Sequence, residues 1–297
     1  MPWLRSRAGT RGRSALSILG YEFMQYALLA GLLGGVACSV VGVLVVSMHL
    51  SFIGVCISHA AFAGAIIALF LGLDPIAGAF LFSLLAAACI GPLADRGDFN
   101  PDTSLGIVFS FMLGLTFLFI GLMPGPKTQA LGLMWGSILT VTPQHLTVLA
   151  VVAVLVLGAV CLFFKEVQAV IFNREIALAV GLPATWIFYG LLLLTGLTVT
   201  ASLQPIGGLL IFSLILNPAA AAYQLTYNLK QVFLLAACFG VLSCWTGLAL
   251  AYLFNLPSGA TIVIFSTLVF ALASLFSPKR KVKQLTEEEL ADAQRVF

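Results

Sequence analysis

The sequence predicts an all-α fold, a polytopic bundle of roughly eight to ten transmembrane helices, on three observations. Hydrophobic residues make up 61% of the 297-residue chain and charged residues only 8%, whereas roughly a quarter of the residues in soluble domains are charged. Apolar runs of about 20 residues recur along the chain, and this length crosses a hydrocarbon layer about 30 Å thick. The runs are apolar around their whole circumference and rich in Gly and Ala, which favours closely packed helices and excludes the alternating strands of a β-barrel.

Nine runs are long and apolar enough to be candidate membrane spans. They define a membrane domain over residues 21–276, between a basic arm (residues 1–20) and a charged tail (residues 277–297). The nine runs are residues 21–47, 51–72, 75–94, 103–123, 144–164, 184–203, 205–225, 231–254 and 258–276.

The distribution of basic residues predicts the orientation of the chain in the cell membrane. Four arginines lie within residues 1–20 and four basic residues within 279–283, so the positive-inside rule puts both termini in the cytoplasm. Two cytoplasmic ends require an even number of crossings. We therefore expect that one run before residue 165 does not cross fully, or that the short run 130–141 is an additional partial element. The segment 165–183 is expected to be a cytoplasmic loop.

Several classes of function are excluded by composition and motifs. The 14 basic residues form no concentrated patch of the kind that binds nucleic acid. The best match to a phosphate-binding loop, residues 121–128, has Pro126 where the second glycine is needed. The three histidines belong to no HExxH motif, no GxSxG is present, and no acidic pair falls within an apolar run. The sequence therefore indicates a non-enzymatic chain without a permanently bound cofactor, and any ATP hydrolysis belongs to a partner.

The run 51–72 opens with polar groups that are costly to bury in hydrocarbon unless they face a partner helix or an aqueous path. Cys56 and His59 are three residues apart and share a helical face. A thiolate and an imidazole are ligands that borderline or softer divalent ions accept. The alternative is a histidine that hydrogen-bonds a carbonyl of a neighbouring helix. The candidate pathway residues here are Ser51, Cys56, Ser58 and His59, with His59 as the candidate metal ligand.

A second polar cluster contains Ser213 and Asn217. Asn217 precedes Pro218, and this pair is expected to interrupt a helix and to free backbone carbonyls that can line a cavity. A kink without any ligand contact is the alternative.

Residues 172–183 are predicted to form a short amphipathic helix that ends at Gly181. Such a helix lies on the membrane surface or docks into a groove on a soluble partner, and the sequence leaves both possibilities open. The residues of interest in this segment are Asn173, Arg174, Glu175, Gly181 and Pro183.

Taken together, the motifs resemble the permease subunit of the ABC-3 family of metal-ion ABC importers, the zinc, manganese and iron group. The resemblance covers most of residues 25–276. In the family's "SF-G-x-x-x-SHA" pattern, this chain retains Ser51, Phe52, Gly54, Ser58, His59 and Ala60. Further matching segments are residues 102–110, 133–139, 173–183, 218–220 and 256–261.

The resemblance implies a membrane homodimer, two cytoplasmic ATPase subunits that use ATP, and an extracytoplasmic protein that delivers the metal ion. It also implies that the helix near 172–183 grips the ATPase and couples it to the bundle. The family usually has an aspartate directly after the glycine of this motif, where this chain has Val55. A carboxylate for a hard ion is missing there, so zinc and manganese rank almost level as the transported divalent ion, with iron behind.

Two other classes of transporter remain as alternatives. A permease for siderophores or cobalamin shares the general plan but needs a wider path. A secondary transporter driven by an ion gradient normally carries acids or basic relays inside the membrane, and the near absence of charge in the apolar runs argues against it.

Overall fold

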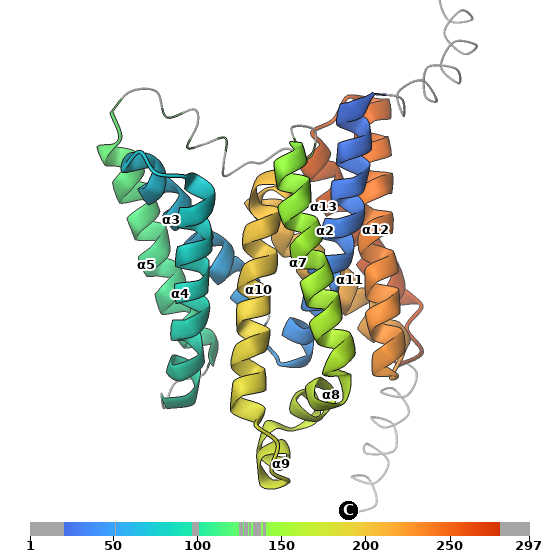
Figure 1. Ribbon diagram of the computed structural model, residues 1–297. Helices are drawn as coiled ribbons and strands as arrows, with labels where there is room; N and C mark the ends of the chain where they lie inside the picture. The colour runs from blue at the N-terminus through green and yellow to red at the C-terminus, as the bar shows by residue number, and fades with distance from the viewer. Residues whose placement is uncertain are drawn as a thin grey trace, which may run out of the picture.

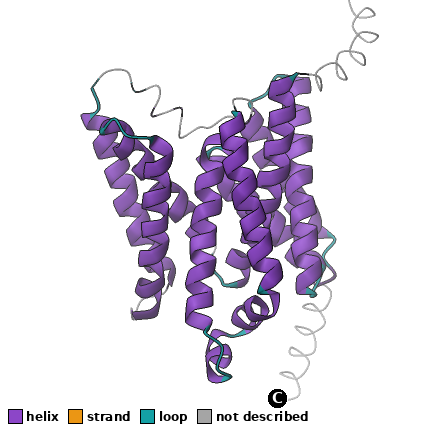
Figure 2. Ribbon diagram, in the orientation of Figure 1, coloured by secondary structure: helices purple, strands orange, loops and turns teal. Residues whose placement is uncertain are grey.

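The computed structural model describes residues 21–50, 52–96, 101–124 and 141–279, together with residues 127, 130, 132 and 138. The described chain is a bundle of helices joined by short loops, and no strand occurs in these ranges (Figure 2). Each of the nine predicted spans coincides with a helix. These helices are α2 (Glu22–Ser47), α3 (Ile53–Phe70), α4 (Pro75–Arg96), α5 (Pro101–Leu122), α7 (Pro143–Leu162), α10 (Ala184–Ile206), α11 (Gly208–Leu225), α12 (Leu229–Phe254) and α13 (Ser258–Leu275).

Eight of these helices are long and apolar enough to cross a membrane, and α11 contributes a shorter apolar stretch, Leu210–Leu225. The short helix therefore lies after residue 165, although the sequence predicted it before that residue. Most of the run 130–141 and all of residues 1–20 and 280–297 lie outside the described residues.

The described chain begins and ends at opposite ends of the bundle. Figure 1 shows the start of α2 at one end, and the end of α13 at the other, beside the two short helices α8 (Phe164–Phe172) and α9 (Arg174–Ala179). This arrangement does not bring residues 21 and 276 to one side of the bundle. The predicted cytoplasmic placement concerns residues 1–20 and 277–297, which lie largely outside the described residues, and it stays a prediction.

The helix α2 runs through the middle of the bundle, where it contacts α7, α10, α11 and α12. Its residues from Ala37 to Val45 are all buried. By contrast, α5 and α13 carry large apolar side chains on an exposed face. Examples are Ile107, Phe111 and Phe117 on α5, and Ile264, Leu268 and Leu272 on α13.

Small residues let the helices approach closely, as the composition predicted. A Cβ atom added to Gly64 of α3 would lie well under 3.0 Å from the backbone oxygen of Gly78 of α4, and a Cβ on Gly78 would meet Gly64 in the same way. Gly35 of α2 and Gly240 of α12 form a second pair of this kind. Backbone meets backbone at these places, so a larger side chain has no flexible neighbour to displace.

Gly78→Leu is expected to destabilise the bundle by about 1–3 kcal/mol, because an overpacked helix contact forces the backbones apart. The matched control is Gly114→Leu on α5, where an added Cβ meets nothing within 4 Å. Unfolding of the purified protein in mixed micelles measures both. Equal unfolding midpoints for the two variants would contradict the close α3–α4 contact.

The helix α11 continues through Pro218, so the predicted interruption at Asn217-Pro218 does not occur. Proline has no amide hydrogen, which leaves the carbonyl four residues earlier without its helical donor. That carbonyl belongs to Leu214, and the Ser39 hydroxyl of α2 donates to it at 3.5 Å. A neighbouring helix therefore satisfies the freed carbonyl, and α11 has no need to unwind.

Candidate functional site

The first turns of α3 leave one narrow stripe partly open. Phe52, Val55 and His59 are partly exposed, while the other described residues between Phe52 and Ala60 are buried. Their spacing of three and four residues puts them on one helical face. That face is turned towards α5, where the Phe109 ring packs edge-on against Phe52 at 5.3 Å and against His59 at 4.8 Å between ring centroids.

The His59 ring is held by its own helix. Its Nδ1 lies 3.0 Å from the carbonyl oxygen of Val55. Because a carbonyl only accepts, Nδ1 carries the proton and donates. In the neutral ring this leaves the lone pair of Nε2 available, which is the arrangement found in metal-binding histidines whose other nitrogen is fixed by a backbone oxygen.

The other candidates near the start of α3 occupy different surroundings. Cys56 is fully buried. The Ser58 hydroxyl is also buried and donates to the same Val55 carbonyl at 2.9 Å. Ser51 lies outside the described residues. Of the residues predicted here, His59 is therefore the described side chain that reaches the partly open face.

Ser213 and Asn217 are joined to each other and to α13. The Asn217 side-chain nitrogen donates towards the hydroxyls of Ser213, Ser266 and Thr267, each at 3.0 Å. The Ser213 and Ser266 hydroxyls are 2.7 Å apart. This cluster ties α11 to α13, and Thr267 opens it towards the exposed face of α13.

The described residues contain no group of three or more His, Cys, Asp or Glu side chains arranged to hold a metal ion.

Residues 164–183 form two short helices, where the sequence predicted a loop up to residue 171 and one helix over 172–183. The break falls at Asn173, whose extended backbone ends α8 and whose side-chain oxygen accepts from the Ile176 amide at 3.0 Å. The asparagine thus caps α9. At the other end Gly181 has φ +86°, the left-handed conformation that favours glycine, which confirms the predicted stop.

The pair α8–α9 protrudes at one end of the bundle (Figure 1) and is anchored to the start of α10. The Arg174 guanidinium donates to the Thr185 hydroxyl at 3.2 Å and lies 4.5 Å from the Phe188 ring centroid. Pro183 directly precedes α10. The helices α9 and α10 are therefore joined by a short junction with two side-chain contacts.

The outer surface of this protrusion is apolar. Phe172 is 83% exposed and Val180 is 70% exposed, and Ile176 and Leu178 are also exposed, with Glu175 beside them. Exposed apolar side chains of this kind mark a contact with another protein or with membrane lipid.

Four features of these sites had not been predicted from the sequence. They are Phe109 against His59, the Ser266–Thr267 partners of Asn217, the Thr185–Phe188 anchor of Arg174, and helix α8. Of these four, only helix α8 has a signal in the sequence, which is the amphipathic pattern of Phe164–Phe172. The other three join residues whose pairing depends on the packing of separate helices.

The comparisons with known proteins agree with this architecture. The manganese transport system membrane protein MntC of Listeria monocytogenes is 34% identical over 263 residues, which cover 89% of this chain and 94% of that protein. The manganese import system permease protein ScaB of Streptococcus gordonii is 31% identical, with 88% of this chain and 94% of that protein covered.

Among solved structures, PsaBC from Streptococcus pneumoniae in complex with Fab is similar with a TM-score of 0.82 and 29% identity. The match covers 92% of this chain and 99% of that chain. The sequence profile described as the ABC 3 transport family matches residues 20–277. That range contains every described membrane helix, the His59 stripe and the α8–α9 protrusion, and the chain therefore belongs to the ABC 3 transport family.

Proposed function

We propose that this chain is the membrane-spanning permease subunit of an ATP-binding cassette importer for divalent transition-metal ions, with manganese as the principal ion. Two relatives that it matches over almost their full length are named for manganese transport or import. The observation in the chain that carries the proposal is the partly open α3 stripe, on which His59 presents an imidazole nitrogen at membrane depth.

In this proposal the metal ion passes along the face shared by α3 and α5. His59 offers one nitrogen ligand, and water or backbone oxygens complete the ion's coordination. The cluster of Ser213 and Asn217 lies on α11 and serves to join α11 to α13.

The protrusion α8–α9 is proposed as the coupling element. A cytoplasmic ATPase subunit grips the exposed apolar side chains of α9, with Glu175 at the edge of the contact. ATP binding and hydrolysis in that partner move α9, and the Arg174 anchor transmits the movement to α10. The chain itself provides the path for the ion and the coupling element that transmits the movement of the ATPase.

The coupling role fixes a proposed orientation. The end of the bundle that carries α9 faces the cytoplasm, and so does the end of α13 beside it (Figure 1). The start of α2 then faces the extracytoplasmic side, where a metal-binding protein delivers the ion. The exposed apolar faces of α5 and α13 are available to a second copy of the chain and to lipid. The proposed assembly is a homodimer with two ATPase subunits.

The proposal is tested in bacteria that lack their own manganese importer and grow poorly when manganese is scarce. Expression of this chain with its ATPase and binding protein is expected to restore growth. Parallel strains limited for zinc and for iron identify the ion. Rescue of the zinc-limited strain alone would contradict manganese as the principal ion, and rescue of none would contradict metal import.

Val55→Asp is expected to raise manganese uptake severalfold relative to zinc uptake. Position 55 is one helical turn before His59 and on the same partly exposed stripe, so a carboxylate there adds an oxygen ligand beside the imidazole. Val55→Asn is the matched control, because the asparagine amide is similar in size to the aspartate carboxylate but carries no charge. Competition between the two ions in the rescued strain gives the ratio. An unchanged ratio in the aspartate variant would mean that the ion does not pass this stripe.

A further inference from the structure

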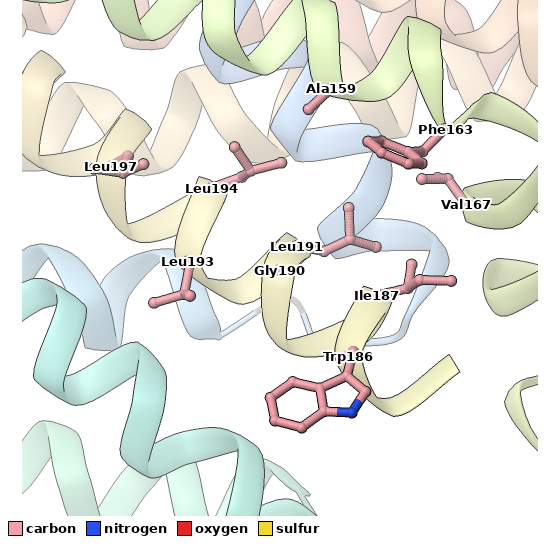
Figure 3. A pocket seen from close by; sticks show the side chains of 10 residues that line it. All are labelled: Ala159, Phe163, Val167, Trp186, Ile187, Gly190, Leu191, Leu193, Leu194 and Leu197. Carbon is pink, nitrogen blue, oxygen red and sulfur yellow. The ribbon is translucent and has the colours of Figure 1, made fainter. Parts of the chain in front are cut away.

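A groove with a volume of about 420 Å³ lies between the end of α7, the start of α8 and the first half of α10. Figure 3 shows Phe163 and Val167 on one side and Ile187, Leu191 and Leu194 on the other. The indole nitrogen of Trp186 is the one polar side-chain atom among its ten lining residues. The lining residues are Ala159, Phe163, Val167, Trp186, Ile187, Gly190, Leu191, Leu193, Leu194 and Leu197.

The groove has a buried floor and an open rim. Val167 and Leu191 are buried, whereas Trp186 is 77% exposed and Phe163 56% exposed. Leu197 follows Trp186 by 11 residues, which is about 16 Å along a helix at 1.5 Å per residue. The groove is therefore elongated along α10, which suits a long and narrow ligand.

Its position in the membrane indicates what fills it. Both α7 and α10 are long and apolar enough to cross a bilayer, so a gap between their outward surfaces meets hydrocarbon. An empty apolar groove loses the dispersion contacts of its lining. Trp186 stands in the first turn of α10 and Phe163 directly follows α7, which puts this end of the groove at the level where aromatic rings meet lipid headgroups.

Charges at the same end fit a phospholipid. Lys165 is exposed in the first turn of α8, beside Phe164, and the Lys230 ammonium of α12 lies 5.7 Å from the Phe164 ring centroid. Glu166 is the neighbouring carboxylate. The exposed ammonium group of Lys165, which stands between the lining residues Phe163 and Val167 in the sequence, complements a phosphate, because basic residues near a membrane surface attract anionic headgroups.

We propose that this groove binds one acyl chain of a membrane phospholipid whose headgroup lies beside Lys165. The chain enters past Trp186 and runs along α10 towards Leu197. Because Val167 belongs to α8 and Ile187 to α10, the bound lipid braces the two helices that flank α9. This site is independent of which ion the protein carries.

A photoreactive phospholipid tests the site. The assembled complex is reconstituted in vesicles of phosphatidylglycerol and phosphatidylcholine that contain a small share of phospholipid with a diazirine in its acyl chain. After irradiation, mass spectrometry locates the labelled residues. We expect label on Leu191 and Leu194 at a low share of the probe, before Val154 of α7 is labelled, although Val154 is 70% exposed.

Gly190→Leu fills the groove, because an added Cβ at Gly190 meets nothing within 4 Å. It is expected to reduce the label on Leu191 and Leu194 severalfold and to leave the label on Val154 unchanged. Gly158→Leu on α7 has equal free space and lies outside the groove, so its labelling should match the unmodified protein.

Two outcomes would overturn the proposal. One is labelling of Val154 without labelling of Leu191 in the unmodified protein, which means that only bulk lipid touches the bundle or that another protein covers the groove. The other is equal groove labelling in the Gly190 and Gly158 variants. The comparison of Leu191 with Val154 needs no substitution, so it stands even if the Gly190 variant does not fold.

Discussion

Replacing His59 with alanine is expected to lower metal uptake at least about tenfold while the protein remains inserted and assembled. His59 lies on the partly exposed stripe of α3, and its Nδ1 is fixed by the Val55 carbonyl. Changing even the partners of metal-binding histidines typically costs about 10–100-fold in affinity or activity. Initial rates of metal uptake into vesicles measure the loss.

The control for this prediction is His145→Ala, which removes an imidazole from the first turn of α7. Its uptake is expected to stay close to that of the unmodified protein. Normal uptake by the His59 variant would mean that His59 only packs against Phe109 and does not bind the ion. A parallel loss of assembled protein in both variants would point to stability and not to the ion path.

Gly181→Val is expected to uncouple ATP hydrolysis from transport. Gly181 has φ +86°, a conformation that a β-branched residue adopts only at a cost of about 1–3 kcal/mol. An added Cβ there meets nothing within 4 Å, so the effect comes from the backbone alone. The strain is relieved by moving α9 away from its place at the start of α10. We expect that ATP hydrolysis no longer responds to the loaded binding protein and that uptake falls severalfold.

Gly181→Asn is the matched variant, because asparagine tolerates the left-handed conformation better than other non-glycine residues. It is expected to retain most of the coupling. Stimulated ATP hydrolysis and uptake are measured on the same vesicles for both variants. Unchanged stimulation in the valine variant would mean that the α9–α10 junction is not the lever.

The sequence predicted the membrane spans well because one physical quantity, the thickness of the hydrocarbon layer, sets their length. All nine runs coincide with helices. The glycine stop at Gly181 was also predictable, because few residues other than glycine accept its backbone conformation. The many small residues predicted that helices would pack closely. They did not predict which glycines would meet, such as Gly64 with Gly78.

What could not be predicted depends on contacts between distant segments. The helix α11 survives Pro218 because Ser39, 175 residues away from Leu214, donates to the freed carbonyl. Asn217 bonds to α13, 49 and 50 residues further along. Helix α8 was missed because an amphipathic segment of only nine residues resembles a loop in mean hydropathy.

The central claim is that this chain forms a metal path driven by a separate ATPase. The most direct measurement is manganese uptake into vesicles that contain the chain, its ATPase and its binding protein, with and without ATP. We expect accumulation only when ATP and the ATPase subunit are both present. Equal accumulation without the ATPase subunit, driven by an ion gradient, would contradict the claim and identify a secondary transporter.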